Sequence, residues 1–125
     1  MPVATFPKSI PDDHPNVWDE IILPCGLKLC NRLAKAAMTE NIADSLSNSP
    51  NALHTMLYKR WGGCGAGLLI TGNVQVDRLY LECPGNVVVE NDNDIKELSS
   101  WATQSQSNGT AVIVQISHAG NYSAI

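Results

Sequence analysis

The chain has 125 residues, which is enough for one domain with a hydrophobic core. Its apolar share of 44% and charged share of 16% are those of an ordinary globular protein. A net charge of −4 without a lysine and arginine cluster argues against a nucleic-acid partner, and no apolar run is long enough to cross a bilayer. Residues 1–15 hold prolines and acidic residues but no apolar block, so we expect no signal peptide and a cytoplasmic location.

The first part of the chain predicts a leader, a hairpin and a strand. Residues 1–16 are rich in proline and aspartate without periodicity, which predicts a loose leader before a folded part at 17–125. Short apolar pieces flank residues 24–26 (Pro-Cys-Gly), which predicts a tight hairpin turn. Residues 33–38 (LAKAAM) then predict a first strand.

A first helix is predicted after the polar segment 41–50. Ser49 suits the N-cap and Pro50 suits the first turn, so the helix is expected to start there. The apolar residues at helical spacing, which define its expected inner face, are Leu53, Met56, Leu57 and Trp61. Residues 62–63, both glycine, predict its end.

The second half continues the alternation of strands and helices. Residues 66–71 (AGLLIT) form an apolar run typical of a strand buried on both faces, and residues 72–90 predict a long loop with an apolar patch. Residues 91–94 offer caps for a second helix. Its expected inner face comprises Ile95, Leu98, Trp101 and Ala102. Residues 110–116 predict a third buried strand. This order indicates an α/β fold with a parallel sheet, either doubly wound or part of a barrel.

Three short polar segments follow the predicted strands. In parallel α/β folds, ligands bind at the carboxyl ends of the strands, which here are residues 37–40, 71–73 and 115–118. Small residues alternate there with Thr, Asn, Gln and His, which exchange hydrogen bonds without a fixed charge. Such a set would suit a flat polar heterocycle with an apolar face. The alternative is ordinary capping and turn chemistry.

The glycine-rich segment, the histidines and the cysteines give weaker indications of a functional site. The glycine-rich segment 62–67 follows a helix and precedes a strand, the reverse of a phosphate-binding loop. The histidines His14, His54 and His118 are scattered and the cysteines match no zinc spacing, so we expect no metal site. His118 alone stands at a predicted strand end, as a ligand-contacting group, a general acid or a structural residue.

Four segments in order resemble the Old Yellow Enzyme/NADH:flavin oxidoreductase family. They are NRLAKAAMTE at 31–40, LYKRWGGCGAGLLITGNVQVDR at 57–78, PGNVVVE at 84–90 and VQISHAG at 114–120. The resemblance covers about residues 21–120. It implies a partial TIM (β/α)₈ barrel, with about the first three β/α units and an N-terminal hairpin, since a complete barrel needs about 250 residues.

The resemblance also implies a cofactor, FMN, and roles for individual residues. The implied cofactor-binding residues are Ala37, Met38, Thr39, Gly72, Asn73 and Gln115. Among them, Thr39 would bond near the C4 oxygen of the flavin and Gln115 would bond its pyrimidine side, while either Gly72 or Asn73 would approach the ring. His118 would contact substrate. The family usually has arginine where this chain has Asn121.

The implied activity is hydride transfer from NAD(P)H through FMN to an activated alkene, a quinone or oxygen, with this chain as an N-terminal fragment that lacks the later catalytic elements. One alternative is a non-catalytic truncated fragment that does not bind FMN or that acts only by association with another chain. Three units would leave an unpaired sheet edge, which favours self-association. Another alternative is an unrelated α/β binding module.

Overall fold

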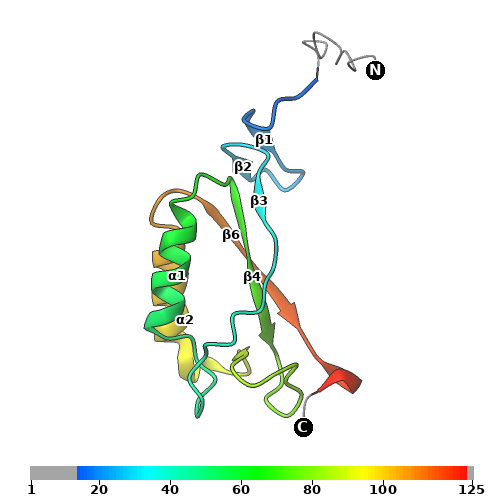
Figure 1. The fold of residues 1–125 in the computed structure, drawn as a ribbon, viewed down its shortest axis with the longest axis vertical. Coiled ribbons are helices and arrows are strands. Elements are labelled where there is room, and N and C mark those ends of the chain that lie inside the picture. The colour runs from blue at the N-terminus through cyan, green and yellow to red at the C-terminus, as the bar shows by residue number, and fades with distance from the viewer. Residues whose placement is uncertain (1–13, 124–125) are drawn as a thin grey trace, which may run out of the picture.

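The computed structural model describes residues 14–123, and residues 1–13 of the predicted leader lie outside them. A hairpin, two helices and a four-stranded sheet make up this part (Figure 1). The strands are β1 (Ile21–Ile22), β2 (Lys28–Leu29), β3 (Ala34–Lys35), β4 (Leu68–Gln75), β5 (Val87–Val88) and β6 (Ala111–Ser117). The helices are α1 (Ala52–Gly62) and α2 (Ile95–Ser105), with 3₁₀ turns at Asp92–Asp94 and Gly120–Tyr122.

The central strand of the sheet is β4. Strands β3, β5 and β6 all run parallel to it, and β6 pairs along its whole length. Strand β3 pairs with the start of β4 and β5 with its end, so these two short strands share the edge opposite β6. Both helices lie on one side of the sheet, and the predicted hairpin lies at the end where the strands begin (Figure 1). The parallel βαβ succession confirms the predicted α/β class.

Two predicted strand boundaries are wrong. The first strand does not extend over 33–38, because regular pairing stops at Lys35. The second strand starts later than predicted and runs on to Gln75, inside the predicted loop 72–90, which also contains β5. Polar residues interrupt the apolar pattern at Thr71 and Asn73, but the ladder to β6 continues past them.

Helix α1 begins at a different cap and buries a different face from those predicted. The side chain of Asn51, rather than Ser49, accepts the backbone N–H groups of Leu53 and His54, and the His54 ring accepts the Asn51 N–H in return. Leu53 and Met56 are 52% and 65% exposed. Of the predicted face, Trp61 does pack, partly buried, against the core. The buried residues are His54, Tyr58 and Gly62, so the inner face is rotated by one position.

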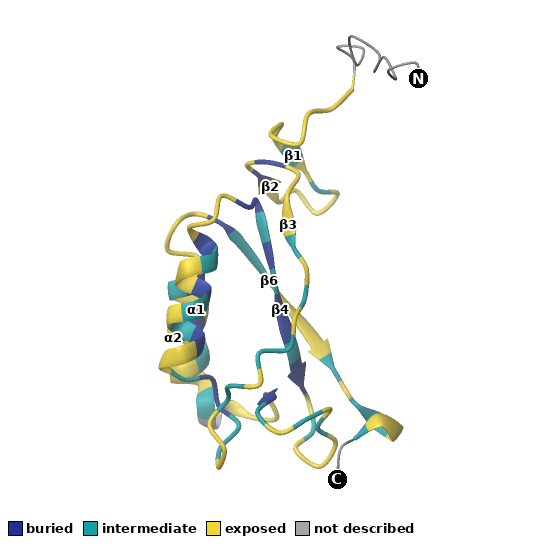
Figure 2. Ribbon diagram, viewed as in Figure 1, coloured by how far each residue is buried: buried dark blue, intermediate teal, exposed yellow. Residues whose placement is uncertain are grey.

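The core lies between the helices and one face of the sheet (Figure 2). Its buried hydrophobic members are Tyr58, Ala66, Leu69, Val74, Val87 and Trp101. The Trp101 ring stands edge-on to the rings of Tyr58 and His54, at centroid distances of 5.1 and 5.3 Å. The predicted inner face of α2 is therefore right for Trp101 and for Leu98, which packs partly buried against the core, whereas Ile95 is 61% exposed and Ala102 is also exposed.

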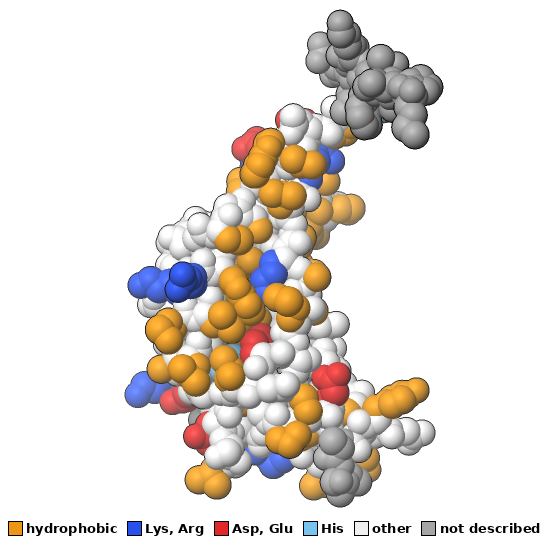
Figure 3. Space-filling view, in the orientation of Figure 1, with side chains coloured by type: hydrophobic (Ala, Val, Ile, Leu, Met, Phe, Trp, Pro, Cys, Tyr) orange, Lys and Arg blue, Asp and Glu red, His pale blue; other side chains and the backbone are white. Residues whose placement is uncertain are grey.

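Strand β6 is paired but not buried, contrary to the prediction for its segment. Ile113, Val114 and Ile116 are 42%, 47% and 69% exposed. The physical reason is the position of β6 at the edge of the sheet, since its only described strand partner is β4. Hydrophobic side chains also lie at the surface elsewhere in the molecule (Figure 3).

A β-bulge interrupts the ladder between β4 and β6. Ile70 pairs with Ile113 and Asn73 with Gln115, so Thr71 and Gly72 together oppose one residue of β6. The Thr71 hydroxyl accepts the Gln115 N–H at 3.0 Å and so bridges the irregularity. The bulge turns the Gly72 N–H away from β6, toward a side chain on the opposite edge of β4.

That side chain is Glu40, which follows β3. One carboxylate oxygen accepts the Gly72 N–H at 3.0 Å and also the hydroxyl of Tyr58. Burial, together with the hydrogen bond to Glu40, raises the pKa of Tyr58, so this hydroxyl stays protonated. Nearby, the Lys35 ammonium donates to the carbonyl of Ile70 at 2.9 Å. Side chains, rather than backbone pairs, thus hold the segment after β3 against β4.

Substitution of Gly72 by alanine is expected to destabilise the chain. An added Cβ would lie 2.5 Å from the Met38 carbonyl oxygen and would also clash with the Glu40 carboxylate. Overpacking of this kind costs about 1–3 kcal/mol of unfolding free energy. Urea titration of Gly72→Ala measures it, with Gly63→Ala as the control, since the nearest atom to a Cβ built there is at 3.4 Å. Equal losses in the two variants would show that the close approach is not required.

The buried His54 is expected to make stability fall with acid. Burial lowers the pKa of His54 below its ordinary value of 6.5, and Nε2 has no hydrogen-bond partner among the described residues. As the pH falls through this value the unfolded chain takes up a proton that the folded chain does not. The unfolding free energy should therefore decrease between about pH 7.5 and 5.5, by at most about 1.4 kcal/mol per pH unit.

The variant His54→Gln isolates this contribution, because a glutamine at the same position can keep the hydrogen bond to the helix cap. Urea titrations at both ends of the pH range should show a shallower pH dependence for this variant. The exposed His14→Gln serves as the control. If His54→Gln keeps the full pH dependence of the unaltered chain, then His54 is not its source.

Candidate functional site

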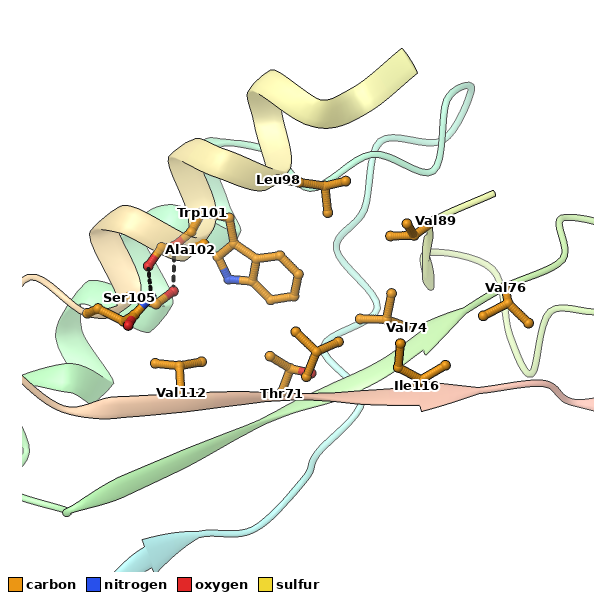
Figure 4. Close-up of a pocket in the computed structure, with 12 residues that line it drawn as sticks. Thr71, Val74, Val76, Val89, Leu98, Trp101, Ala102, Ser105, Val112 and Ile116 are labelled. Carbon is orange, nitrogen blue, oxygen red and sulfur yellow. Dashed lines mark hydrogen bonds between the residues drawn. The ribbon is translucent and has the colours of Figure 1, made fainter. Parts of the chain in front are cut away.

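Two of the predicted cofactor-binding residues are neighbours in the sheet. Asn73 of β4 and Gln115 of β6 are register partners across the ladder. The next residues along, Val74 and Ile116, point toward α2 (Figure 4). Because successive side chains of a strand point to opposite faces, Asn73 and Gln115 present their amides on the face away from the helices.

A third predicted residue reaches the same place from the segment after β3. The Thr39 hydroxyl donates to a carboxylate oxygen of Glu82 at 3.3 Å, and the Asn73 side-chain amide donates to the same oxygen at 2.5 Å. The Thr39 hydroxyl and the Asn73 amide therefore lie close together, on either side of one Glu82 oxygen. The structure thus brings Thr39, Asn73 and Gln115 together near one end of the sheet.

The remaining predicted cofactor contacts frame this group. Gly72 precedes Asn73 and is buried, with its backbone close to the Met38 carbonyl. The Met38 side chain is 51% exposed, and Ala37 is half-buried. An exposed thioether beside hydroxyl and amide donors provides apolar surface and hydrogen-bonding groups together. The side chains of the predicted contact residues carry no charge, and the one carboxylate among their partners is that of Glu82.

The predicted substrate residue, His118, lies just after β6. Its Nδ1 accepts the Gly120 N–H at 3.1 Å, so the proton of the neutral ring is on Nε2. That nitrogen lies 3.9 Å from a carboxylate oxygen of Asp77, and the ring lies 5.0 Å from the ring of Tyr80. Asp77 and Tyr80 follow β4, so His118 also lies where the ends of β4 and β6 meet.

Two polar residues at this end were not among the predicted site residues. Glu82 sits in the loop after β4, and no sequence pattern links it to Thr39, 43 positions away. Gln75 is wholly buried, and neither of its side-chain amide atoms has a hydrogen-bond partner among the described residues. Because side chains of a strand alternate between its faces, Gln75 lies on the same face as Asn73. Its spacing of two residues from Asn73 is the sequence signal that could have identified it.

Within residues 14–123, no cluster of three or more histidine, cysteine or acidic side chains is arranged to hold a metal ion. In the same part of the chain, neither helix has the length and apolar character of a membrane span.

Comparison with curated proteins identifies relatives of this chain. It is 39% identical over 104 residues to the NADH-dependent flavin oxidoreductase iliE of Hypocrea jecorina (strain QM6a), a match that covers 80% of the chain and 26% of the relative. It is 35% identical over 109 residues to the NADH-dependent flavin oxidoreductase iccE of Talaromyces variabilis, covering 84% of the chain and 26% of the relative. The chain thus spans about a quarter of the length of these relatives. No model of a protein family matches it.

Solved structures share the fold. Morphinone reductase superposes with a TM-score of 0.78 at 19% identity, over 87% of this chain and 28% of that chain. The old yellow enzyme from Trypanosoma cruzi gives a TM-score of 0.74 at 22% identity, over 86% of this chain and 28% of that chain. The predicted fold, an open part of a TIM barrel with its first β/α units, is thereby confirmed. Over about a quarter of their length, the chain is thus similar in sequence to NADH-dependent flavin oxidoreductases and in fold to morphinone reductase and an old yellow enzyme.

Proposed function

We propose that this chain supplies the flavin-contacting strand ends of an NADH-dependent flavin oxidoreductase and that its cofactor is FMN. The observation that carries the proposal is the convergence of Thr39, Asn73 and Gln115 from three separate strand ends. The names of the curated relatives support a flavin and NADH as the reactants.

The donor set fits the polar edge of a flavin. The Thr39 hydroxyl would exchange its hydrogen bond to Glu82 for one near the C4 oxygen, and the Gln115 amide would serve the pyrimidine side, where it can both donate and accept. Asn73, or the backbone at Gly72, would approach the ring from the middle strand. Ala37 and Met38 would lie along the ring. None of these side chains carries a charge, so they orient the ring and set its electrostatic surroundings while the redox chemistry belongs to the cofactor.

When bound, FMN would supply hydride transfer from NADH to an activated alkene, a quinone or oxygen. His118 would contact that substrate, because it stands beside the ring-binding residues at the ends of β4 and β6. With Nδ1 occupied by the Gly120 N–H, Nε2 is the ring atom left to donate a hydrogen bond to a substrate oxygen. The Asp77 carboxylate lies 3.9 Å from this nitrogen, beyond hydrogen-bond distance.

Titration of FMN with the purified chain tests the cofactor assignment. The chain should quench flavin fluorescence to saturation, and Gln115→Leu should bind about five- to tenfold more weakly, because one to two hydrogen bonds to the ring are lost. Thr39→Val should weaken binding by a similar factor. The matched control is Gln104→Leu on α2, away from these strand ends.

Two results would contradict the cofactor assignment. The first is the absence of any saturable change in flavin fluorescence with the unaltered chain. The second is equal affinity for FMN in Gln115→Leu and Gln104→Leu, because the strand-end amide would then make no contact with the ring.

A second candidate function is association with another copy through β6. A groove of about 330 Å³ runs between α2 and the sheet (Figure 4). Its lining is almost wholly apolar and includes Leu98, Trp101, Val112, Val114 and Ile116. The edge of β6 that faces away from β4 has no strand partner among the described residues, and a free edge beside an apolar groove favours pairing with a further strand. Association would then accompany flavin binding or replace it.

Light scattering of the purified chain tests the association. The unaltered chain should have the mass of an assembly, and Ile116→Lys should reduce it to the mass of one chain, because a buried ammonium in the groove is strongly unfavourable. Leu46→Lys is the control, since Leu46 is 90% exposed and does not line the groove. A monomeric unaltered chain, or equal masses for both variants, would exclude this interface.

A further inference from the structure

One edge of β4 has a gap between its two short partner strands. Strand β3 pairs up to Leu69, and β5 begins to pair at Val74. Between these positions, residues 70–73 have no strand beside them on that edge. The segment after β3, residues 36–40, lies there instead. This segment includes the predicted flavin contacts Ala37, Met38 and Thr39, so their position depends on whatever fastens it to β4.

The Glu40 carboxylate attaches the last residue of the segment 36–40 to β4. Its Oε1 accepts the Gly72 N–H at 3.0 Å and the Tyr58 hydroxyl. The Gly72 N–H also points at the Tyr58 oxygen, 3.1 Å away. Tyr58 comes from α1 and has no exposed surface. One oxygen atom therefore joins three parts of the chain, namely the end of the segment, the bulge of β4 and the buried face of α1.

A second contact fastens the start of the segment. The Lys35 ammonium donates to the Ile70 carbonyl at 2.9 Å and to the Ala36 carbonyl at 2.7 Å, and it lies 4.4 Å from the centre of the Trp61 ring. The Met38 carbonyl approaches Gly72 between the two fastenings. The segment is thus held at both of its ends, on either side of the residues predicted to face the flavin.

We propose that Glu40 and Tyr58 are positioning residues of the flavin site, which hold the Gly72 amide and thereby fix Asn73 relative to Thr39. The inference rests on the proposed function, because the flavin is the group whose contacts would be fixed. Neither residue needs to touch the ring, since both act on the backbone that precedes Asn73. Their chemistry suits the task because a carboxylate is a stronger acceptor than a neutral oxygen, and Tyr58 orients it from a rigid helix.

Removal of the carboxylate would leave the buried Tyr58 hydroxyl without an acceptor, and the Gly72 N–H would keep only the Tyr58 oxygen, 3.1 Å away. Buried donors without an acceptor are costly, so the bulge would be expected to shift or to open locally. The middle of the β4–β6 ladder is held by its own backbone pairs and should stay closed. Loss of Glu40 should therefore affect the Gly72 amide selectively, which a general loss of stability would not.

Amide hydrogen exchange of the flavin-free chain, followed by NMR, tests the fastening directly. Glu40→Ala should raise the exchange rate of the Gly72 amide by roughly ten- to a hundredfold relative to that of Leu69. Glu40→Gln retains a side-chain oxygen and should restore most of the protection. Tyr58→Phe preserves the aromatic packing and should raise the Gly72 rate as well, so it serves if Glu40→Ala fails to fold. Glu97→Ala, at an exposed position of α2, is the control.

An unchanged Gly72 exchange rate in Tyr58→Phe and in Glu40→Ala would overturn the inference. An equal increase at Gly72 and at Leu69 would overturn it too, because Glu40 and Tyr58 would then act only on global stability. Selective exposure of Gly72 that Glu40→Gln reverses is the supporting result.

FMN titration of the same variants separates this inference from the proposed function. If the unaltered chain binds FMN, Glu40→Ala should weaken binding roughly tenfold while Glu40→Gln stays close to the unaltered chain, and equal affinities in all three would overturn the positioning role. If no form of the chain binds FMN, the proposed cofactor is wrong, and with it the flavin role of Glu40 and Tyr58. The exchange data would then still report whether the two residues hold the Gly72 amide.

Discussion

The arrangement of the strand ends depends on a single irregularity, the β-bulge at Thr71 and Gly72. It places one extra residue in β4 and turns the Gly72 amide out of the ladder, toward Glu40. The Thr71 hydroxyl replaces the lost backbone contact to β6. Beyond the bulge, Asn73 is in register with Gln115 on the face away from the helices. The bulge therefore sets the register that pairs Asn73 with Gln115, and it also leaves the Gly72 N–H in need of the Glu40 side chain as an acceptor.

The order of elements was predictable because it follows from periodicity and from glycine and proline punctuation, which are local properties of the chain. Helix faces were less predictable. His54 and Tyr58 count as polar in a pattern of hydrophobic residues, yet they fill the space beneath Trp101 because their rings pack edge-on to it. Strand ends were the least predictable, because they depend on contacts between distant parts of the chain. At the end of β3, for example, the Lys35 side chain bonds the carbonyl of Ile70, 35 positions along the chain.

The candidate site shows the same division between local and distant information. Its residues could be proposed from their place after each strand and from the family resemblance, and the register of β4 and β6 brings Asn73 and Gln115 together. Their roles toward a flavin stay predictions. Glu82 could not be found in this way, and although Glu40 ends the predicted segment 37–40, its contact with Gly72 could not be foreseen. These contacts span loops whose course is set by tertiary packing.

The two short strands on one edge of β4 have a wider consequence. Backbone hydrogen bonds between strands can form with many different sequences. In the interval between β3 and β5, by contrast, the contacts to β4 come from particular side chains. Related chains could therefore differ at 36–40 and reshape the wall of the site while their strand ladders remain intact. Such an interval is a place where an inherited barrel can acquire a new preference for its ligand without rebuilding its scaffold.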